Sequence, residues 1–259
     1  MTLHWGISLL TLGQEDLPLV TLKSENRSIS GEFNPIEDGP CSNHFIDLGA
    51  HQGESIAGFI NYCQYYNIKE KYSISSYESS RQAQIWSPLT ATAMRYEANY
   101  QSMYVSNYAV SGKTGIADFR DDGSAGSSLH PAKPLNRNEK TFRVPTVGIG
   151  EVISNIPDNV ENLILKINIE GGEYDLLKSL LEDEKSLCKI TEIWLDFHGH
   201  QFKDKWKYLF EELEFVFELR KTGIKCYDVD FMSGFYKGYD LHPPCKKPVT
   251  YLELINQYM

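Results

Sequence analysis

One segment constrains the fold of this chain more than any other: residues 163–169, which read Leu-Ile-Leu-Lys-Ile-Asn-Ile. The run is rich in β-branched and apolar residues and lacks the polar alternation of a strand with one face in water. It is typical of a central strand in a parallel sheet that is covered on both faces. Glu170-Gly-Gly follows it directly, which predicts a turn at the carboxyl end of the strand.

Predicted strands and helices alternate around this segment. Further strands are expected at residues 44–50, 72–77, 103–110, 142–147, 190–197 and 215–219. Apolar residues at helical spacing indicate helices near 56–63, 174–181 and 206–213. Capping-box patterns predict that Ser79 with Gln82 opens another helix and that Thr250 with Glu253 caps a short one near the C-terminus. This order predicts an α/β fold in which helices cover both faces of a mostly parallel, doubly wound sheet.

The 259 residues suit one domain with an addition at its N-terminus. Residues 1–43 join a hydrophobic start to a polar stretch of turn formers, so we interpret them as an extension packed on a core of residues 44–259. Within this core, residues 111–141 hold the densest turn chemistry, including Asp121-Asp-Gly and the run Ser124-Ala-Gly-Ser-Ser128. We expect a hairpin or excursion loop there that closes over a bound ligand.

The charge balance narrows the classes of partner. The chain has 35 acidic and 25 basic side chains and a net charge of −10, which argues against non-specific binding to nucleic acid or an anionic membrane. No apolar run approaches the roughly 18 residues of a transmembrane helix. The five cysteines are scattered and never spaced as CxxC, so we expect no disulfide scaffold, no zinc knuckle and a cytoplasmic location.

Polar residues follow the predicted strands at the points where they end. They are Asp47 with Gly49 and Gly53, then Glu78, Asn107, Asn168 with Glu170, and Asp196 with His198. In an open parallel sheet, ligands bind outside the carboxyl ends of the strands, where the strand order reverses. A ligand site is therefore expected along this edge.

The first of these turns reads Asp47-Leu-Gly-Ala-His-Gln-Gly53. Its spacing is G-x-x-x-G and not the G-x-G-x-x-G of dinucleotide sites. A pyrophosphate favours a helix N-terminus free of negative charge, whereas Asp47 and Glu54 flank this turn. The pattern favours a ligand with an amino group and a sulfonium, although an ordinary tight strand–helix turn remains an alternative.

Glu78 lies 25 residues beyond Gly53, at the end of the second strand. A carboxylate in this position accepts hydrogen bonds from both ribose hydroxyls in nucleotide-binding folds. The alternative is a solvated charge at the start of a helix. The pairing with the glycine turn favours ribose binding.

These features together resemble the FkbM family of S-adenosylmethionine-dependent methyltransferases. The matching segments are Phe45–Ser55 (FIDLGAHQGES), Tyr77-Glu78, Asn107–Ser111 (NYAVS) and, most specifically, Leu165–Glu173 (LKINIEGGE) with Leu176-Leu177. The likeness runs from His44 to His200. It implies a Rossmann-like class I methyltransferase fold that uses S-adenosylmethionine and acts mostly on hydroxyl groups of sugars or natural products.

The resemblance also implies a donor site. It places Asp47, Gly49 and Gly53 around the amino-acid portion of the donor. Glu78 falls on the ribose, and Asn107 to Ala109 lie near the adenine. The donor-binding set expected here is Asp47, Gly49, Ala50, His51, Gly53, Ser55, Glu78, Ser79, Asn107, Ala109, Ser127, Asn168 and Glu170. Asn168 departs from the family, which usually carries Asp there, and asparagine cannot act as a base.

The catalytic candidates are His198, His200, Glu173 and Asp196. A histidine is the usual base at neutral pH, so we expect His198 or His200 to take the acceptor proton and Glu173 or Asp196 to orient it. A metal site built from Asp196, His198 and His200 is the rival interpretation; we expect no metal. Glu170 and Glu173 also suit the start of a helix without a catalytic role. Lys166, in a buried strand, is expected to pair with a carboxylate.

The sequence therefore predicts a methyltransferase that modifies a hydroxyl group on a sugar, a glycan or a small natural product. One alternative is an NAD-dependent oxidoreductase, which the G-x-x-x-G spacing disfavours. Another is a non-catalytic domain that keeps the donor pocket, which Asn168 leaves open. Residues 1–43 and 220–259 lie outside the resemblance and are where acceptor specificity is expected.

Overall fold

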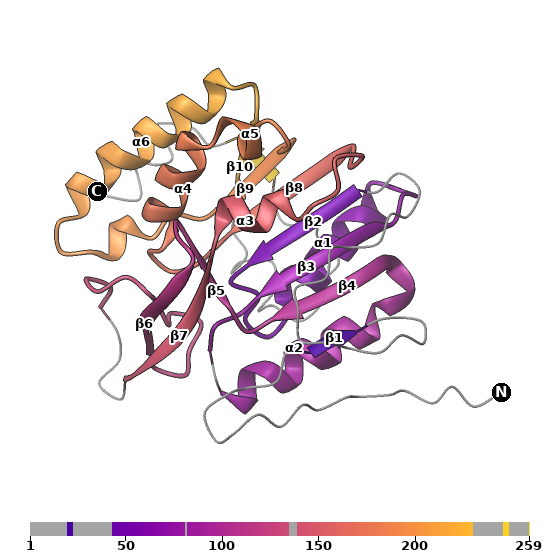
Figure 1. Cartoon of the computed structure of the whole chain (residues 1–259), viewed down its shortest axis with the longest axis horizontal. Helices are drawn as coiled ribbons and strands as arrows, with labels where there is room; N and C mark the ends of the chain where they lie inside the picture. Colours follow the sequence, from indigo (N-terminus) through magenta and orange to yellow (C-terminus); the bar gives the residue numbers. More distant parts are fainter. Residues whose placement is uncertain (1–19, 23–42, 81, 135–138, 230–245, 249–258) are drawn as a thin grey trace.

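The structure is a computed structural model that describes residues 20–22, 43–80, 82–134, 139–229, 246–248 and 259. Its main feature is an eight-stranded sheet of order β1-β4-β3-β2-β8-β9-β10-β11 (Figure 1). The strands are β1 (Val20–Leu22), β2 (Asn43–Leu48), β3 (Tyr72–Tyr77), β4 (Tyr100–Ser106), β8 (Asn162–Ile167), β9 (Glu192–Leu195), β10 (Lys225–Val229) and β11 (Lys246–Pro248).

The six inner strands β4, β3, β2, β8, β9 and β10 run parallel, and β1 and β11 pair antiparallel at the two edges. Numbered along the chain, the parallel strands take the order 3-2-1-4-5-6 of a doubly wound Rossmann sheet. The predicted fold class is therefore confirmed. The strand order reverses between β2 and β8, which puts the expected ligand site at their carboxyl ends.

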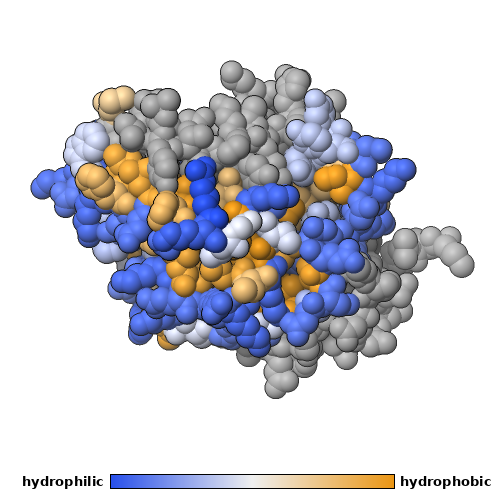
Figure 2. All heavy atoms as spheres, turned by 90° about the horizontal axis from the view of Figure 1, so that it is seen from above, coloured by the Kyte–Doolittle hydropathy of each residue, from blue (hydrophilic) through white to orange (hydrophobic). Residues whose placement is uncertain are grey.

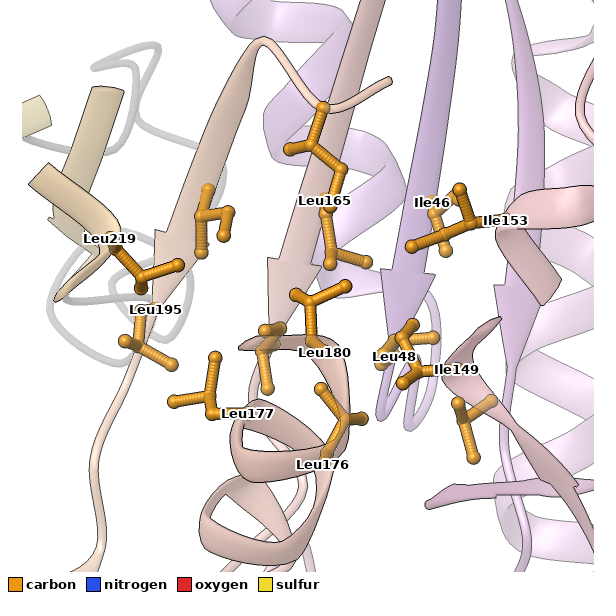
Figure 3. Close-up of a cluster of buried hydrophobic side chains, with 14 of the residues drawn as sticks. Ile46, Leu48, Ile149, Ile153, Leu165, Leu176, Leu177, Leu180, Leu195 and Leu219 are labelled. Atoms are coloured by element: carbon orange, nitrogen blue, oxygen red, sulfur yellow. The ribbon is translucent and has the colours of Figure 1, made fainter. Parts of the chain in front are cut away.

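Helices cover both faces of this sheet. The helices are α1 (Glu54–Tyr65), α2 (Ala83–Arg95), α3 (Ile149–Ser154), α4 (Glu173–Glu182), α5 (Glu184–Leu187) and α6 (Lys205–Lys221), with the 3-10 turns η1 (Glu97–Asn99) and η2 (Gly199–Gln201). Successive strand residues point to opposite faces. Phe45 accordingly stacks on Phe59 of α1, whereas Ile46 joins the apolar cluster formed with α3, α4 and α6 (Figure 3).

A second, three-stranded sheet lies beside the carboxyl ends of the main sheet. It has the order β5-β7-β6 and consists of β5 (Ala109–Ser111), β6 (Gly115–Asp121) and β7 (Lys140–Gly148). Strands β6 and β7 pair antiparallel. The turn-rich region at 111–141 thus contains a hairpin, and we call residues 122–134 of its connection the hairpin loop.

The strand predicted at residues 215–219 is wrong, because α6 continues through it to Lys221. Leu209, Val216 and Leu219 are buried while Phe217 is 50% exposed, which is a helical and not an alternating pattern. The helix ends where Gly223 takes a φ of +82°, a backbone shape that glycine adopts without strain. The sixth parallel strand is β10 instead.

Two other expectations needed correction. The helix expected to open at Ser79 begins at Ala83. Gln82, which was expected to complete the capping box, instead donates from Nε2 to Asp121 of β6, and Ser80 Oγ donates to the same carboxylate. The strand expected at 103–110 is two strands, β4 and β5, which belong to different sheets. The helix expected at Thr250 lies outside the described residues.

The surface is mostly hydrophilic, as Figure 2 shows for the side on which α6 lies in Figure 1. Apolar patches interrupt it. Helix α6 exposes Trp206, Phe210 and Phe217. Among the described residues, no helix combines the length and the apolarity needed to cross a membrane. Cys188 and Cys226 are free thiols, whereas Cys41 and Cys245 lie outside the described residues.

Candidate active site

A pocket of about 480 Å³ opens at the carboxyl ends of β2, β3, β8 and β9, where the strand order reverses. This volume falls in the range of small-molecule sites, about 300–1,000 Å³. Its lining includes Gly49, Ala50, His51, Glu54 and Ser55 after β2; Glu78 and Ser79 after β3; Tyr108 just before β5, with Ala109 and Phe119 of the small sheet; Ser127 and Leu129 of the hairpin loop; and Asn168, Glu170, Asp196, His198, His200 and Gln201 after β8 and β9.

The glycine turn after β2 brings backbone to the pocket wall. Gly49 has a φ of +77°, and a Cβ there would overlap the backbone oxygen of Asn168. Beneath the turn, Lys166 Nζ lies 2.9 Å from Asp47 Oδ1 and donates to the carbonyl oxygens of Leu48 and Gly49. The predicted carboxylate partner of Lys166 is therefore confirmed, and it is Asp47.

Glu78 is fixed at the end of β3 by two backbone amides. Its Oε2 accepts from the His51 amide at 2.8 Å, and its Oε1 accepts from the Ser80 amide at 2.7 Å. Burial raises the pKa of the Glu78 carboxyl, although both amides oppose this rise. Each oxygen keeps a second lone pair, so the carboxylate can accept hydrogen bonds from a ligand.

His51 and Glu54 form a second charged pair on this wall, with 3.0 Å between Nδ1 and Oε1. Burial alone would lower the pKa of His51, but the hydrogen bond and the charge of Glu54 outweigh it and raise the pKa. The pair was not recognised as an interaction from the sequence. The spacing of three residues at the start of a helix was the available signal.

Three residues of the predicted donor set do not line the pocket. Asp47 is fully buried under the glycine turn, where it accepts from Ser55 Oγ as well as pairing with Lys166. Gly53 instead packs against Thr92 of α2, and Asn107 precedes the lining residue Tyr108. Asp47 and Gly53 shape the wall from behind.

The opposite wall is the turn between β8 and α4. Glu170 takes a φ of +56°, which is strained for a residue with a side chain, and Gly171 follows at +101°. Glu173, the first residue of α4, accepts from the backbone amides of Ile169 and Gly171. Glu173 is fully buried and does not line the pocket, so it orients neighbours rather than touching a ligand.

His198 lies between two carboxylates. Its Nδ1 is 2.8 Å from Glu173 Oε1, its Nε2 is 3.2 Å from Glu170 Oε1, and Asp196 Oδ2 is 3.8 Å away. Burial alone would lower the pKa of His198, but these carboxylates outweigh it and raise the pKa well above its ordinary value. Both ring nitrogens of His198 thus contact carboxylates, an arrangement that favours the doubly protonated ring over a proton-accepting role.

His200 is the neutral histidine of this wall. Burial lowers its pKa, and the positive charges of His198 and Lys133 lower it further. Asp196 also lines the pocket and accepts from Asn168 Nδ2 at 3.3 Å. Within the described part of the chain, no group of His, Cys, Asp or Glu side chains is arranged to hold a metal ion.

The hairpin loop forms the remaining wall. Ser127 and Leu129 line the pocket, whereas Ser128 is buried and donates to the backbone oxygen of Glu170. Asp121 anchors the start of the loop by accepting from Ser80, Gln82 and Ser127. Lys133 pairs with Glu170. The contacts of Asp121 with Ser80 and Gln82, and of Lys133 with Glu170, were not evident from the sequence, since each joins residues more than 35 positions apart.

The profile of the methyltransferase FkbM domain matches residues 47–223. Among solved structures, the chain is similar to methyltransferase FkbM from Methylobacillus flagellatus KT, with 20% identity and a TM-score of 0.36. That likeness covers 54% of this chain and 29% of the other, so it spans less than a third of that protein. No curated protein matches the sequence.

Proposed function

Since this chain belongs to the FkbM family of methyltransferases, we propose that it transfers a methyl group from S-adenosylmethionine to a hydroxyl group. The acceptor is a sugar, a glycan or a small natural product. The observation that carries the proposal is Glu78, which lines the pocket with its two oxygens held by backbone amides and can accept further hydrogen bonds from ribose hydroxyls.

Other features of the pocket support this donor over a dinucleotide. Gly49 packs so closely on the Asn168 backbone that a side chain there would displace the turn at the pocket wall. Four carboxylates line the pocket, those of Glu54, Glu78, Glu170 and Asp196. They suit a ligand with a sulfonium and an ammonium group, and they would repel the pyrophosphate of NAD.

S-adenosylmethionine supplies an activated methyl group when bound. The residues of the chain hold the acceptor hydroxyl in line with it, which accounts for much of the acceleration in a bimolecular transfer. His200, neutral and at the pocket wall, takes the proton of the hydroxyl. Asp196 and Asn168 orient the acceptor from the ends of β9 and β8. His198 stays protonated and holds Glu170 in place.

Methyl transfer from labelled donor onto a panel of sugars, glycans and natural products tests this assignment. His200→Ala should lower turnover by about 100- to 10,000-fold, the usual contribution of a general base, while donor affinity stays within about twofold. Lys140→Ala, at an exposed position on β7, should leave turnover unchanged and serves as the control. A chelator should not alter the wild-type rate.

A normal rate for His200→Ala would remove His200 as the base. Activity that a chelator abolishes and a divalent metal restores would reassign Asp196, His198 and His200 as metal ligands. The absence of methyl transfer to every acceptor, together with intact donor binding, would favour the non-catalytic alternative.

A further inference from the structure

Lys133 is only 3% exposed, although it belongs to a loop. Burying an ammonium group removes its water shell, a cost that only a well-placed opposite charge offsets. The partner is Glu170, whose Oε2 contacts the Lys133 Nζ directly at the pocket wall. The lysine at the start of β7, Lys140, is exposed by contrast. The burial of this loop lysine against a carboxylate of the pocket therefore suggests that the contact has a function.

This contact is the last of three in a chain of four groups of alternating charge. Glu173 contacts Nδ1 of His198, Nε2 of His198 contacts Oε1 of Glu170, and Oε2 of Glu170 contacts Nζ of Lys133. The charges of His198 and Lys133 lower the pKa of the Glu170 carboxyl, against the opposing effect of burial. The chain of charges begins at the first residue of α4 and ends in the hairpin loop. It therefore joins the rigid wall of the pocket to the loop that covers it.

Backbone contacts bring the loop to the same point. Ser128 Oγ donates to the backbone oxygen of Glu170. Arg120 Nη1 donates to the carbonyl oxygens of Pro131 at 2.7 Å and Lys133 at 2.9 Å. The ring of His130 stacks on Phe202, just after η2, with 4.5 Å between centroids. Between Asp121 and His130 lie Ser124, Ala125, Ser127 and Leu129, the loop residues that line the pocket.

We propose that Lys133 is a positioning residue for the methyl donor: through Glu170 it holds residues 122–134 over the pocket, so that Ser127 and Leu129 enclose the bound ligand. The inference rests on the proposed function for the identity of the ligand only. The tie between Lys133 and Glu170 holds the loop in the free protein as well.

Lys133→Met tests the proposal, since it keeps the length of the side chain and removes the charge. Glu170 still has His198 as a partner in this variant, so the change does not leave a buried carboxylate alone. Amides of residues 122–134 should exchange with deuterium at least tenfold faster than in the wild type, with and without ligand. S-adenosylhomocysteine should bind about tenfold to a hundredfold more weakly, mainly through faster dissociation.

Lys133→Arg should restore most of the protection and the affinity, and Lys140→Met should alter neither. Unchanged exchange in the loop of Lys133→Met would overturn the proposal. Global destabilisation of the variant without a selective effect on the loop would also overturn it. The same holds if Lys133→Met and Lys133→Gln fail to fold while Lys133→Arg folds. If the wild type does not bind S-adenosylhomocysteine, the proposed function falls, whereas exchange in the free protein still decides the role of Lys133.

Discussion

Single residues set the charge and shape of the pocket. Glu170 takes a strained backbone conformation that lets one carboxylate meet both His198 and Lys133. Strain of this kind persists only where the surroundings enforce it, and it concentrates at functional sites. The carboxylates around His198 raise its pKa, whereas burial and the charges of His198 and Lys133 lower the pKa of His200.

Gly49 gives a prediction at this scale. Gly49→Ala should abolish donor binding or destabilise the fold, because its Cβ would overlap the Asn168 backbone oxygen in addition to straining φ. Gly223→Ala is the matched control: its φ of +82° is similar, but nothing lies within 4 Å of the added Cβ. It should cost only the conformational penalty, about 1 kcal/mol. The melting temperature and the ligand affinity of both variants should be measured by thermal unfolding and titration. Equal losses in the two variants would mean that close packing at Gly49 is unimportant.

Residue types at strand ends were predictable from the sequence, but their partners were only partly so. A buried strand lysine needs a carboxylate, so the pairing of Lys166 was foreseeable. The two carboxylate contacts of His198 could not be foreseen. They arise because the positive-φ turn at Glu170 brings the side chains of Glu170 and Glu173 to opposite nitrogens of the ring. Lys133 likewise gains its partner from tertiary structure alone.

Among the elements, the strands were more predictable than the helix boundaries. Strand β3 has the predicted bounds of Tyr72 and Tyr77, because its six residues are all buried and are bounded by turns. Helix α6 was divided in error, since Phe215–Leu219 contains the residue types typical of a strand. Burial of Val216 and Leu219 against the sheet outweighed that preference.

Substitutions in α6 test the helical assignment. Leu219→Ala should lower the free energy of unfolding by about 2–5 kcal/mol, since Leu219 is fully buried in the core shown in Figure 3. Phe217→Ala should change it by less than about 0.5 kcal/mol, as is usual at the surface. In a strand both side chains would share one face, so denaturant unfolding that gives similar large losses would contradict the helix.

Across the whole molecule, charge pairs and the sheet order act together. The doubly wound sheet brings four strand ends to one pocket, and the chain of charges from Glu173 to Lys133 closes it. The pattern of buried strands predicted this sheet, because right-handed crossovers leave few arrangements. The β5-β7-β6 sheet was predicted only in part: a hairpin at 111–141 and a strand at 142–147 were expected, but β5 was joined to β4 and its parallel pairing with β7 was not foreseen.

The buried histidine makes stability depend on pH. His198 has a raised pKa in the folded protein, so the folded state binds its proton more tightly than the unfolded state. The stability it contributes is complete below the ordinary histidine pKa of about 6.5 and is lost as the pH rises through the raised value. His198→Asn should therefore flatten the fall in melting temperature from neutral to alkaline pH. Parallel curves for the two proteins would contradict the protonated state.

Calorimetric titration with S-adenosylhomocysteine tests the central claim most directly, because it measures the donor site without any acceptor. We expect one molecule to bind per chain and Glu78→Ala to weaken binding by about 1.5–3 kcal/mol, as for lost hydrogen bonds to a charged group. Glu70→Ala, at an exposed position before β3, should leave it unchanged. No heat and no thermal shift at millimolar ligand, or tighter binding of NAD, would contradict the account.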